Sequence, residues 1–362
     1  MTRLRDRYPL SSGTPLLVAA CYALAVVVPA HAPLREWVEL VFFYARNMYP
    51  IWLLVGVVLL LIQMVRDQRS GNQRSMQSIV RDFAGRHWDY DRGFSFLMPP
   101  IVATMLLATY NMFKQRVLPS AGFSLDSHLA AVDRSMFGTD AWQLTHSWFP
   151  SPWVTQAIDI LYHPLFFPMT ISIALCSFMA PQSEVRFRYL LGYTLLWSVV
   201  GSMFAFLMPA AGPCFDYFFH GNEVDFRPLT DLLAQQHAYL KSVGAPGLYS
   251  LSYQEHLLSL FGSDGVALGG GISAIPSLHN GMTALFVCAA ISWNRKLAFV
   301  LIPYSLIIWF GSMHLGWHYG IDGIVGNILA IACWMMTRSV VPQAYQQGSR
   351  RYRPDPTVLS PA

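Results

Sequence analysis

The chain has 362 residues, of which 54% are hydrophobic and only 12% are charged, and its formal net charge is +4. Soluble proteins carry about 25% charged residues, so this composition excludes an ordinary soluble protein and indicates a polytopic membrane protein. The basic residues are spread along the chain and not gathered in one face, which argues against a nucleic acid partner.

Apolar segments close to the length of about 20 residues that a helix needs to cross a bilayer recur along the whole chain. They lie at 15–32, 48–65, 94–113, 153–179, 189–208, 279–293, 297–314 and 321–337. The sequence therefore predicts an all-α polytopic membrane protein with about eight transmembrane helices and with both termini on the same side.

The distribution of basic residues gives this arrangement a direction, because Lys and Arg collect in cytoplasmic loops. Most of the 24 Lys and Arg residues fall in alternate segments, namely the N-terminus, 66–92, 186–188, 295–296 and the C-terminal tail. The opposite segments hold the others, which are Arg35, Arg46, Lys114, Arg116, Arg134, Arg227 and Lys241. This bias predicts cytoplasmic termini.

Two predicted loops on the non-cytoplasmic side, 114–152 and 209–278, are long enough to hold structure. The first contains a segment with both acidic and basic residues, and leucines recur with helical spacing in the second, so we expect amphipathic helices at the membrane interface. On the cytoplasmic side, 66–92 is expected to be a basic connector. The tail at 339–362 contains Gln, Pro and Arg and is expected to be disordered.

Three ionisable residues lie at the ends of apolar segments in the last third of the chain. His279 follows the sequence PSL at the start of the sixth segment, and His318 and Asp322 lie between the seventh and the eighth. The predicted topology places all three at the non-cytoplasmic surface. Residues four apart share one face of a helix, so Asp322 is expected to hold the tautomer of His318.

A run of three glycines, Gly269, Gly270 and Gly271, precedes these residues. Glycine backbones bring N–H groups close to an anion, and the start of the sixth helix adds unsatisfied donors. A phosphate held there would lie beside the two histidines. One histidine, held by a carboxylate, is suited to attack phosphorus and the other to protonate the departing oxygen, without a metal ion or another cofactor.

A second pair with the same spacing, Asp159 and His163, falls inside the fourth apolar segment. An ionisable residue inside a membrane is costly and needs a partner or a water-filled cavity. We prefer a mutual hydrogen bond as the explanation. The alternative is that the pair lines a substrate cavity.

The motifs IPSLHNG and HLGWHYGID resemble the second and third signature motifs of the type-2 phosphatidic acid phosphatase superfamily, which are written PSGH and SRxxxxxHxxxD. The variant PSLH with HYxxD is more similar to the inositol phosphorylceramide synthase branch and its bacterial relatives, which implies a bacterial inner membrane. The resemblance covers 93–338, the length of that family's six-helix core. It divides the chain into two N-terminal helices with a connector (1–92), a catalytic domain (93–338) and a tail (339–362).

The resemblance also implies roles for individual residues. His318 would be the nucleophile that forms a phosphohistidine, Asp322 would orient it, and His279 would be the general acid. Ser277 and the backbone around it would bind the phosphate.

Two cations of the family motifs are replaced in this sequence. Gly311 and Ser312 occupy the positions of the SR pair. The first motif, KxxxxxxRP, has an incomplete counterpart in HGNEVDFRP, where His220 stands in place of lysine and Arg227 and Pro228 match the last two positions. A phosphoryl transition state needs positive charge around its oxygens, so we predict that Arg227 and Lys241 of the second long loop supply it. The predicted substrate-binding residues are therefore Ser277, Gly270, Gly271, Arg227, Lys241 and Ser312.

The sequence thus predicts an integral-membrane enzyme, a metal-independent phosphoric ester hydrolase or phosphotransferase that acts on a lipid phosphate ester at the non-cytoplasmic face. Water, an alcohol or a lipid would be the acceptor, and the PSLH variant and the missing arginine favour transfer. Two other classes stay open. A transporter or scaffold would also have many helices, and a metal-dependent membrane oxidase could use two histidines and a carboxylate as ligands.

Overall fold

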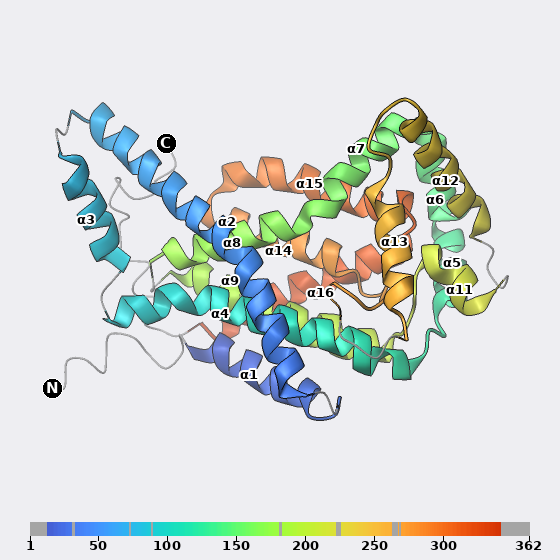
Figure 1. Ribbon diagram of the computed structural model, residues 1–362, viewed down its shortest axis with the longest axis horizontal. Helices are drawn as coiled ribbons and strands as arrows, with labels where there is room; N and C mark the ends of the chain where they lie inside the picture. The colour runs from blue at the N-terminus through green and yellow to red at the C-terminus, as the bar shows by residue number, and fades with distance from the viewer. Residues whose placement is uncertain are drawn as a thin grey trace.

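The computed structural model describes residues 13–30, 33–71, 74–87, 90–180, 183–221, 226–262, 267 and 269–341. Every regular element within these residues is a helix (Figure 1), which confirms the all-α prediction. The arginines of the N-terminus and nearly all of the predicted disordered tail lie outside the described residues.

In the described chain, 6 helical segments are long and apolar enough to cross a membrane. They are α2 (Leu34–Arg69); α4 (Tyr90–Met112) with its continuations η2 (Phe113–Val117) and η3 (Leu118–Ala121); α7 (Pro152–Tyr162), η4 (His163–Leu165) and α8 (Phe166–Phe178); α9 (Glu184–Leu195), η5 (Leu196–Phe204) and α10 (Ala205–Leu207); α15 (Arg295–His314); and α16 (Gly320–Ser339). Two shorter apolar helices, α1 (Thr14–Val27) and α14 (Leu278–Trp293), coincide with the other two predicted spans. The chain therefore has the helical architecture of an integral membrane protein.

Helix α2 is longer than the predicted second span, because it begins at Leu34 and not near residue 48. Its first turns are polar, so hydropathy alone did not include them. Arg35 pairs with Glu39 at 2.8 Å, and Glu36 pairs with Arg116 of η2 at 2.7 Å. These ion pairs satisfy the charges of the first turns, and the helix continues beyond the apolar run. The predicted cytoplasmic connector also contains a helix, α3 (Met76–His87).

Helix α14 packs against both α15 and α16. It approaches α16 closely because both helices carry glycine there: a Cβ atom on Gly281 would lie 3.2 Å from the carbonyl oxygen of Gly326. Leu196, Met282 and Leu285 are buried in the core of the bundle around α14. This packing holds the first turn of α14 beside the first turn of α16, where the two sequence motifs lie.

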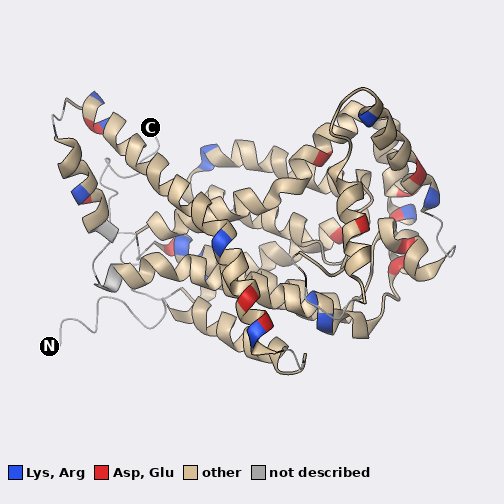
Figure 2. Cartoon of the chain, viewed as in Figure 1, with Lys and Arg blue, Asp and Glu red and all other residues tan. Residues whose placement is uncertain are grey.

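The two long loops fold into a cap of short helices at one end of the molecule (Figure 1). The cap consists of α5 (Asp126–Phe137), α6 (Ala141–Trp148), η6 (Pro213–Phe215), α11 (Asp216–His220), α12 (Arg227–Ser242) and α13 (Tyr249–Leu260). Leu229, Leu233 and Leu240 are buried in a core that belongs to this cap. The apolar face of α12 therefore packs against protein. Acidic residues gather in the same end (Figure 2).

Candidate active site

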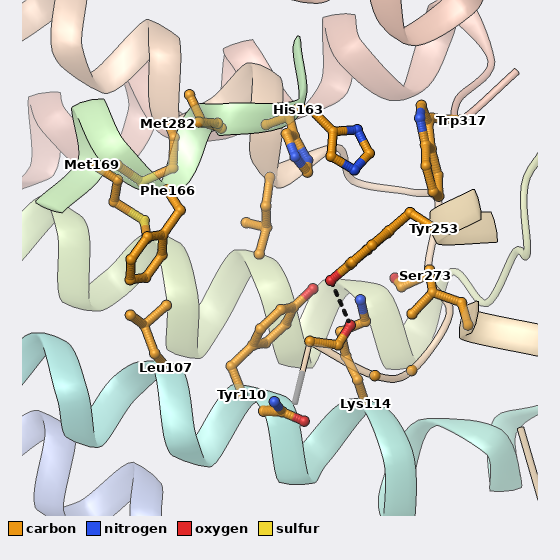
Figure 3. Close-up of a pocket in the computed structure, with 18 of the residues that line it drawn as sticks. Leu107, Tyr110, Lys114, His163, Phe166, Met169, Tyr253, Ser273, Met282 and Trp317 are labelled. Carbon is orange, nitrogen blue, oxygen red and sulfur yellow. Dashed lines mark hydrogen bonds between the residues drawn. The ribbon is translucent and has the colours of Figure 1, made fainter. Parts of the chain in front are cut away.

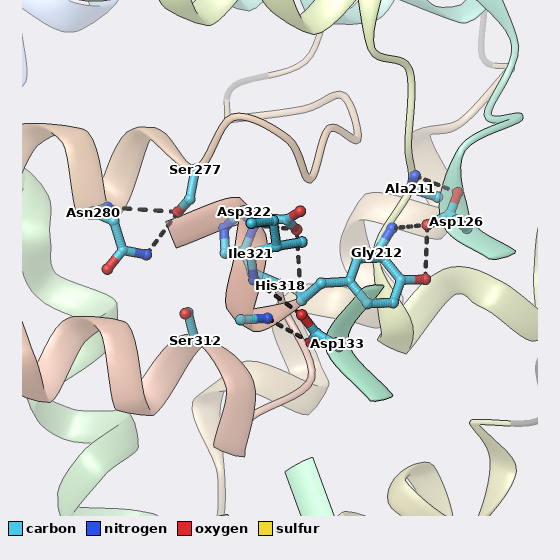
Figure 4. Close-up of polar contacts among 12 residues, drawn as sticks. Asp126, Asp133, Ala211, Gly212, Ser277, Asn280, Ser312, His318, Ile321 and Asp322 are labelled. Carbon is cyan, nitrogen blue, oxygen red and sulfur yellow. Dashed lines mark hydrogen bonds and ion pairs between the residues drawn. The ribbon is translucent and has the colours of Figure 1, made fainter. Parts of the chain in front are cut away.

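The two sequence motifs meet through hydrogen bonds (Figure 4). Ser277 is the N-cap of α14, and its Oγ accepts a hydrogen bond from the Asn280 amide at 3.0 Å. The N–H of Ser277 donates to the carbonyl oxygen of Asp322 at 3.1 Å, and the N–H of His318 donates to the carbonyl oxygen of Ser312 at 3.1 Å. The starts of α14 and α16 and the end of α15 are thus joined in one small region.

The three predicted catalytic residues lie together at this junction. The ring centroids of His279 and His318 are 6.4 Å apart. Nδ1 of His318 lies 3.5 Å from Oδ2 of the fully buried Asp322. The His279 ring also stacks on the ring of Tyr162, with centroids 4.8 Å apart. Residues that are far apart in the sequence therefore form one cluster.

Asp322 has two functions in this geometry. It caps α16, since its Oδ2 accepts the N–H of Tyr319 at 3.0 Å, and the same oxygen faces His318. Burial lowers the pKa of His318 to about 3, so the imidazole is uncharged at neutral pH. Nδ1 is the ring nitrogen turned to the carboxylate, so Nε2 lies on the side of the ring away from Asp322.

Both histidines line a cavity of about 590 Å³ (Figure 3). Figure 3 shows apolar side chains at one side of it, including Leu107, Phe166 and Met169, and polar or aromatic side chains at the other, including Lys114, Tyr253 and Trp317. The apolar side chains come from the membrane helices. The cavity is thus amphipathic, and its size is typical of a site for a small molecule.

The second N-terminal helix, α2, contributes to this cavity. Phe43, Tyr44 and Ile51 of α2 are among its lining residues. A hydrogen bond of 2.9 Å joins the hydroxyl of Tyr44 to the amide of Asn111 on α4. Helix α2 is therefore a wall of the site, a role that the sequence did not indicate.

The glycine segment packs tightly on the end of α4. Gly269 and Gly271 have φ values of +65° and +86°, a conformation that favours glycine. A Cβ atom on Gly271 would lie 2.5 Å from the Cβ of Lys114, and one on Gly270 would lie 2.6 Å from the Gln115 side chain. The glycines line the cavity, and the close contact with α4 is a second reason for their presence.

The other predicted substrate-binding residues do not line the cavity. Ser277 and Ser312 are fully buried, and Ser312 Oγ donates to the backbone of its own helix. The guanidinium of Arg227 lies over the ring of Tyr217, 4.2 Å from the centroid. Lys241 is exposed in the last turn of α12. Both predicted cations thus belong to the cap and do not line the cavity that contains the histidines.

Lys114 lines the cavity, although its place after the apolar run predicts a loop residue. The apolar run ends at residue 113, but the helical segment continues through η2. A helix extended by one turn past the apolar run would have placed Lys114 on the same segment as Tyr110, which also lines the cavity.

The pair Asp159 and His163 does not form the mutual hydrogen bond that we preferred from the sequence. His163 Nδ1 is 3.8 Å from Asp159 Oδ1. Asp159 accepts hydrogen bonds from the N–H groups of Tyr249 and Ser250 and from the Ser250 hydroxyl. Asp159 thus holds the first turn of α13, and His163 lines the cavity, as the alternative interpretation proposed.

Two buried aspartates of α5 hold backbone next to the site (Figure 4). Asp126 accepts the N–H groups of residues 211 and 212 at 2.9 and 2.8 Å. Asp133 accepts the N–H groups of Gly320 and Ile321 at 2.7 and 3.0 Å, and burial raises its pKa to about 6. Their seven-residue spacing, which puts both on one face of a helix, was the available sequence signal.

Within the described part of the chain, no group of three or more His, Cys, Asp or Glu side chains is placed to hold a metal ion. His279, His318 and Asp322 therefore do not form the ligand set that the oxidase hypothesis needs.

Comparison with known proteins identifies the family. The model of the PAP2 superfamily matches residues 127–336, an interval that contains both motifs. The inositol phosphorylceramide synthase of Candida albicans (strain SC5314 / ATCC MYA-2876) is 26% identical over 182 residues, which are 48% of this chain and 33% of that protein. The chain thus spans about a third of the length of this curated relative. No solved structure matches the chain. Because the family model covers more than half of the chain, and in agreement with the motif resemblance, the protein belongs to the PAP2 superfamily.

Proposed function

We propose that the protein is an integral-membrane lipid phosphatase or phospho-headgroup transferase that works through a phosphohistidine. The observation that carries this proposal is that His279 and His318 line the same cavity, in which side chains of the membrane helices form the apolar part. A lipid phosphate ester has the same two parts. Its phosphate would lie at the histidines and its hydrocarbon chain among the apolar side chains.

In the first step, the lone pair on Nε2 of His318 attacks phosphorus. The bond between phosphorus and the lipid oxygen breaks, and His279, protonated at this stage, gives its proton to the leaving oxygen. Asp322, 3.5 Å from the other nitrogen of His318, stabilises the positive charge that develops on the ring. The products are a phosphohistidine and a lipid alcohol.

In the second step, the oxygen of an acceptor attacks phosphorus, and His279, now neutral, takes the proton of that oxygen. The phosphorus–nitrogen bond breaks, and its electron pair returns to Nε2 of His318. Water as acceptor completes a hydrolysis, and an alcohol completes a transfer. The relative from C. albicans is named a synthase, which supports an alcohol or lipid acceptor.

The proposal includes a topology. The termini face the cytoplasm, the active site opens at the non-cytoplasmic face of a bacterial inner membrane, and the catalytic domain is 93–338 with the first two helices as an extension. The alternation of basic residues between loops supports this orientation.

The test is a panel of labelled lipid phosphates given to the purified protein with EDTA present, with and without alcohol acceptors. Both free phosphate and transferred headgroup are measured. We expect activity in EDTA, and we expect His318→Ala to lower it by at least about 10³-fold without loss of folding. Phosphate release or headgroup transfer that persists in the folded H318A variant would rule out the phosphohistidine mechanism.

A further inference from the structure

The phosphate end of the cavity needs a fixed cation, and the family motif does not supply one here. We propose that Lys114 is the residue that binds the transferred phosphate and stabilises its charge in the transition state. This inference rests on the proposed function, because it assigns one more residue to the same site.

The position of Lys114 carries the proposal. It is the one Lys or Arg among the described residues that line the cavity, and it shares that cavity with His279 and His318. Its Nζ lies 5.6 Å from the centroid of the Tyr110 ring. In Figure 3 its side chain extends from η2, the continuation of α4, toward Tyr253, on the polar side of the cavity.

The backbone at Lys114 is held against the segment that leads into the first motif. Gln115 donates to the carbonyl oxygen of Ala267 at 2.7 Å and accepts the N–H of the same residue at 2.8 Å. Gly271 packs directly on the backbone of Lys114, where a Cβ atom would lie 2.8 Å from the carbonyl carbon. The ammonium group is therefore attached to a fixed point beside the site, as electrostatic stabilisation of a transition state requires. Lys114 also lies in the π-helical segment η2, and π-helical turns recur at functional sites.

The charge of Lys114 acts on the nucleophile. Burial is the largest cause of the lowered pKa of His318, and the positive charge of Lys114 lowers the pKa further. The ammonium is thus within electrostatic reach of the ring that attacks phosphorus. Within the described part of the chain, no acidic side chain forms an ion pair with Lys114. A bound phosphate would supply the missing counter-charge.

The other candidates for this role are less well placed. The position of the motif arginine is taken by Ser312, and the neighbouring Gly311, at the position of the motif serine, has no room for a side chain, since a Cβ atom there would lie 2.9 Å from Ile158. Ser312 is buried and bonded to its own helix. Arg227 and Lys241 belong to the cap and do not line the cavity. A cation from η2 thus replaces one that the family motif carries at the end of α15.

The experiment compares Lys114→Met, which removes the charge and keeps the length of the side chain, with Lys296→Met, the same change at an exposed lysine in the first turn of α15. Inorganic phosphate is the probe, because it is the part that all candidate lipids share. The rise in Tm with phosphate concentration is measured for the full-length wild type, K114M, K296M and H318A. The turnover of the best lipid phosphate in the panel is measured for the same proteins.

We expect phosphate to raise the Tm of the wild type, K296M and H318A, and K114M to need about 10- to 100-fold more phosphate for the same rise. The turnover of K114M should fall by about 10²- to 10³-fold, the usual effect of losing one charge-stabilising donor. A K114M protein that binds phosphate and turns over like the wild type would overturn the proposal, and so would a wild type that phosphate does not stabilise.

The two proposals fail in different ways. If H318A is inactive while K114M keeps its turnover and its phosphate response, the phosphohistidine mechanism stands and the role of Lys114 is wrong. If H318A stays active but K114M loses the phosphate response, the phosphate site stands and the mechanism is wrong. If K114M does not fold, the same two measurements are made on Lys114→Gln, which also removes the charge, and they decide the role of Lys114.

Discussion

Two pairs of histidine and aspartate lie beside the cavity with the same four-residue spacing but with different partners for the carboxylate. Both oxygens of Asp159 accept hydrogen bonds from the start of α13, and His163 Nδ1 is 3.8 Å away. Asp322 accepts the N–H at the start of its own helix and lies 3.5 Å from His318, while its Oδ1 has no hydrogen-bond partner among the described residues.

A four-residue spacing therefore brings a histidine near a carboxylate, but other donors can still occupy the carboxylate. N–H groups from a segment about 90 residues further along the chain satisfy Asp159. Through these hydrogen bonds, Asp159 links α7 to the cap. Asp322 keeps capacity for the imidazole, because only one N–H of its own helix start competes for it. We therefore expect substitution of Asp322 to lower kcat and substitution of Asp159 to lower the stability of the fold.

The largest effect is expected from Asp322→Asn. An amide can still accept the N–H of Tyr319, but it cannot stabilise positive charge on His318. We expect kcat to fall by about 10³- to 10⁴-fold, as when the aspartate of a catalytic triad becomes asparagine, and Tm to change little. The measurement is turnover of the best lipid phosphate together with thermal unfolding. If D322N kept kcat within about tenfold of the wild type, Asp322 would not be a positioning residue.

A smaller effect, and of another kind, is expected from Asp159→Asn. The change leaves one acceptor oxygen for the donors of Tyr249 and Ser250, so the protein should lose about 2–3 kcal/mol of stability. We expect a lower Tm, measured by intrinsic fluorescence, and a kcat much closer to the wild type than that of D322N. A D159N protein with unchanged Tm and a kcat as low as that of D322N would reverse the assignment of the two pairs.

The smallest effect is expected from His163→Gln. His163 lines the cavity, but its neighbouring carboxylate is already satisfied by other donors. General acid or base catalysis by a histidine raises the rate by about 10²- to 10⁴-fold. We expect His163→Gln to lower kcat by about tenfold or less, which would show that His163 is not a general acid or base. The matched change, His318→Gln, should lower kcat by at least about 10³-fold. An equal loss of kcat in the two variants would contradict the expectation that His163 only lines the cavity while His318 takes part in catalysis.

The helices were largely predictable, and their limits were not. Every predicted span contains a helix, because burial of a long apolar run in lipid is a local property of the chain. The start of α2 at Leu34 was missed, since ion pairs such as that between Glu36 and Arg116 depend on a residue of another helix. The helical continuation of α4 through Lys114 was missed as well, because it also depends on contacts with another helix.

The grouping of the two histidines and the aspartate was predictable, because it depended on motifs. His279, His318 and Asp322 were chosen from the sequence, and the structure brings them together at the start of α14 and α16. The substrate-binding cations were predicted from loop membership, which cannot tell that Arg227 and Lys241 lie away from the cavity. Asp126 and Asp133 were overlooked, because a carboxylate that binds the backbone of a distant segment looks like any charge on an amphipathic helix.

The sequence by itself determined the helical class, the alternation of basic loops and the run from Gly269 to Asp322 that holds the histidines and the carboxylate. These features depend on hydropathy, charge and spacing, which are local. Only the tertiary structure shows how the two carboxylates are shared with other donors and that Lys114 is the cation, among the described residues, that lines the cavity. Both depend on contacts between distant segments, such as α13 with Asp159 and the glycine segment with Lys114, and on whether those contacts leave a polar group free to act.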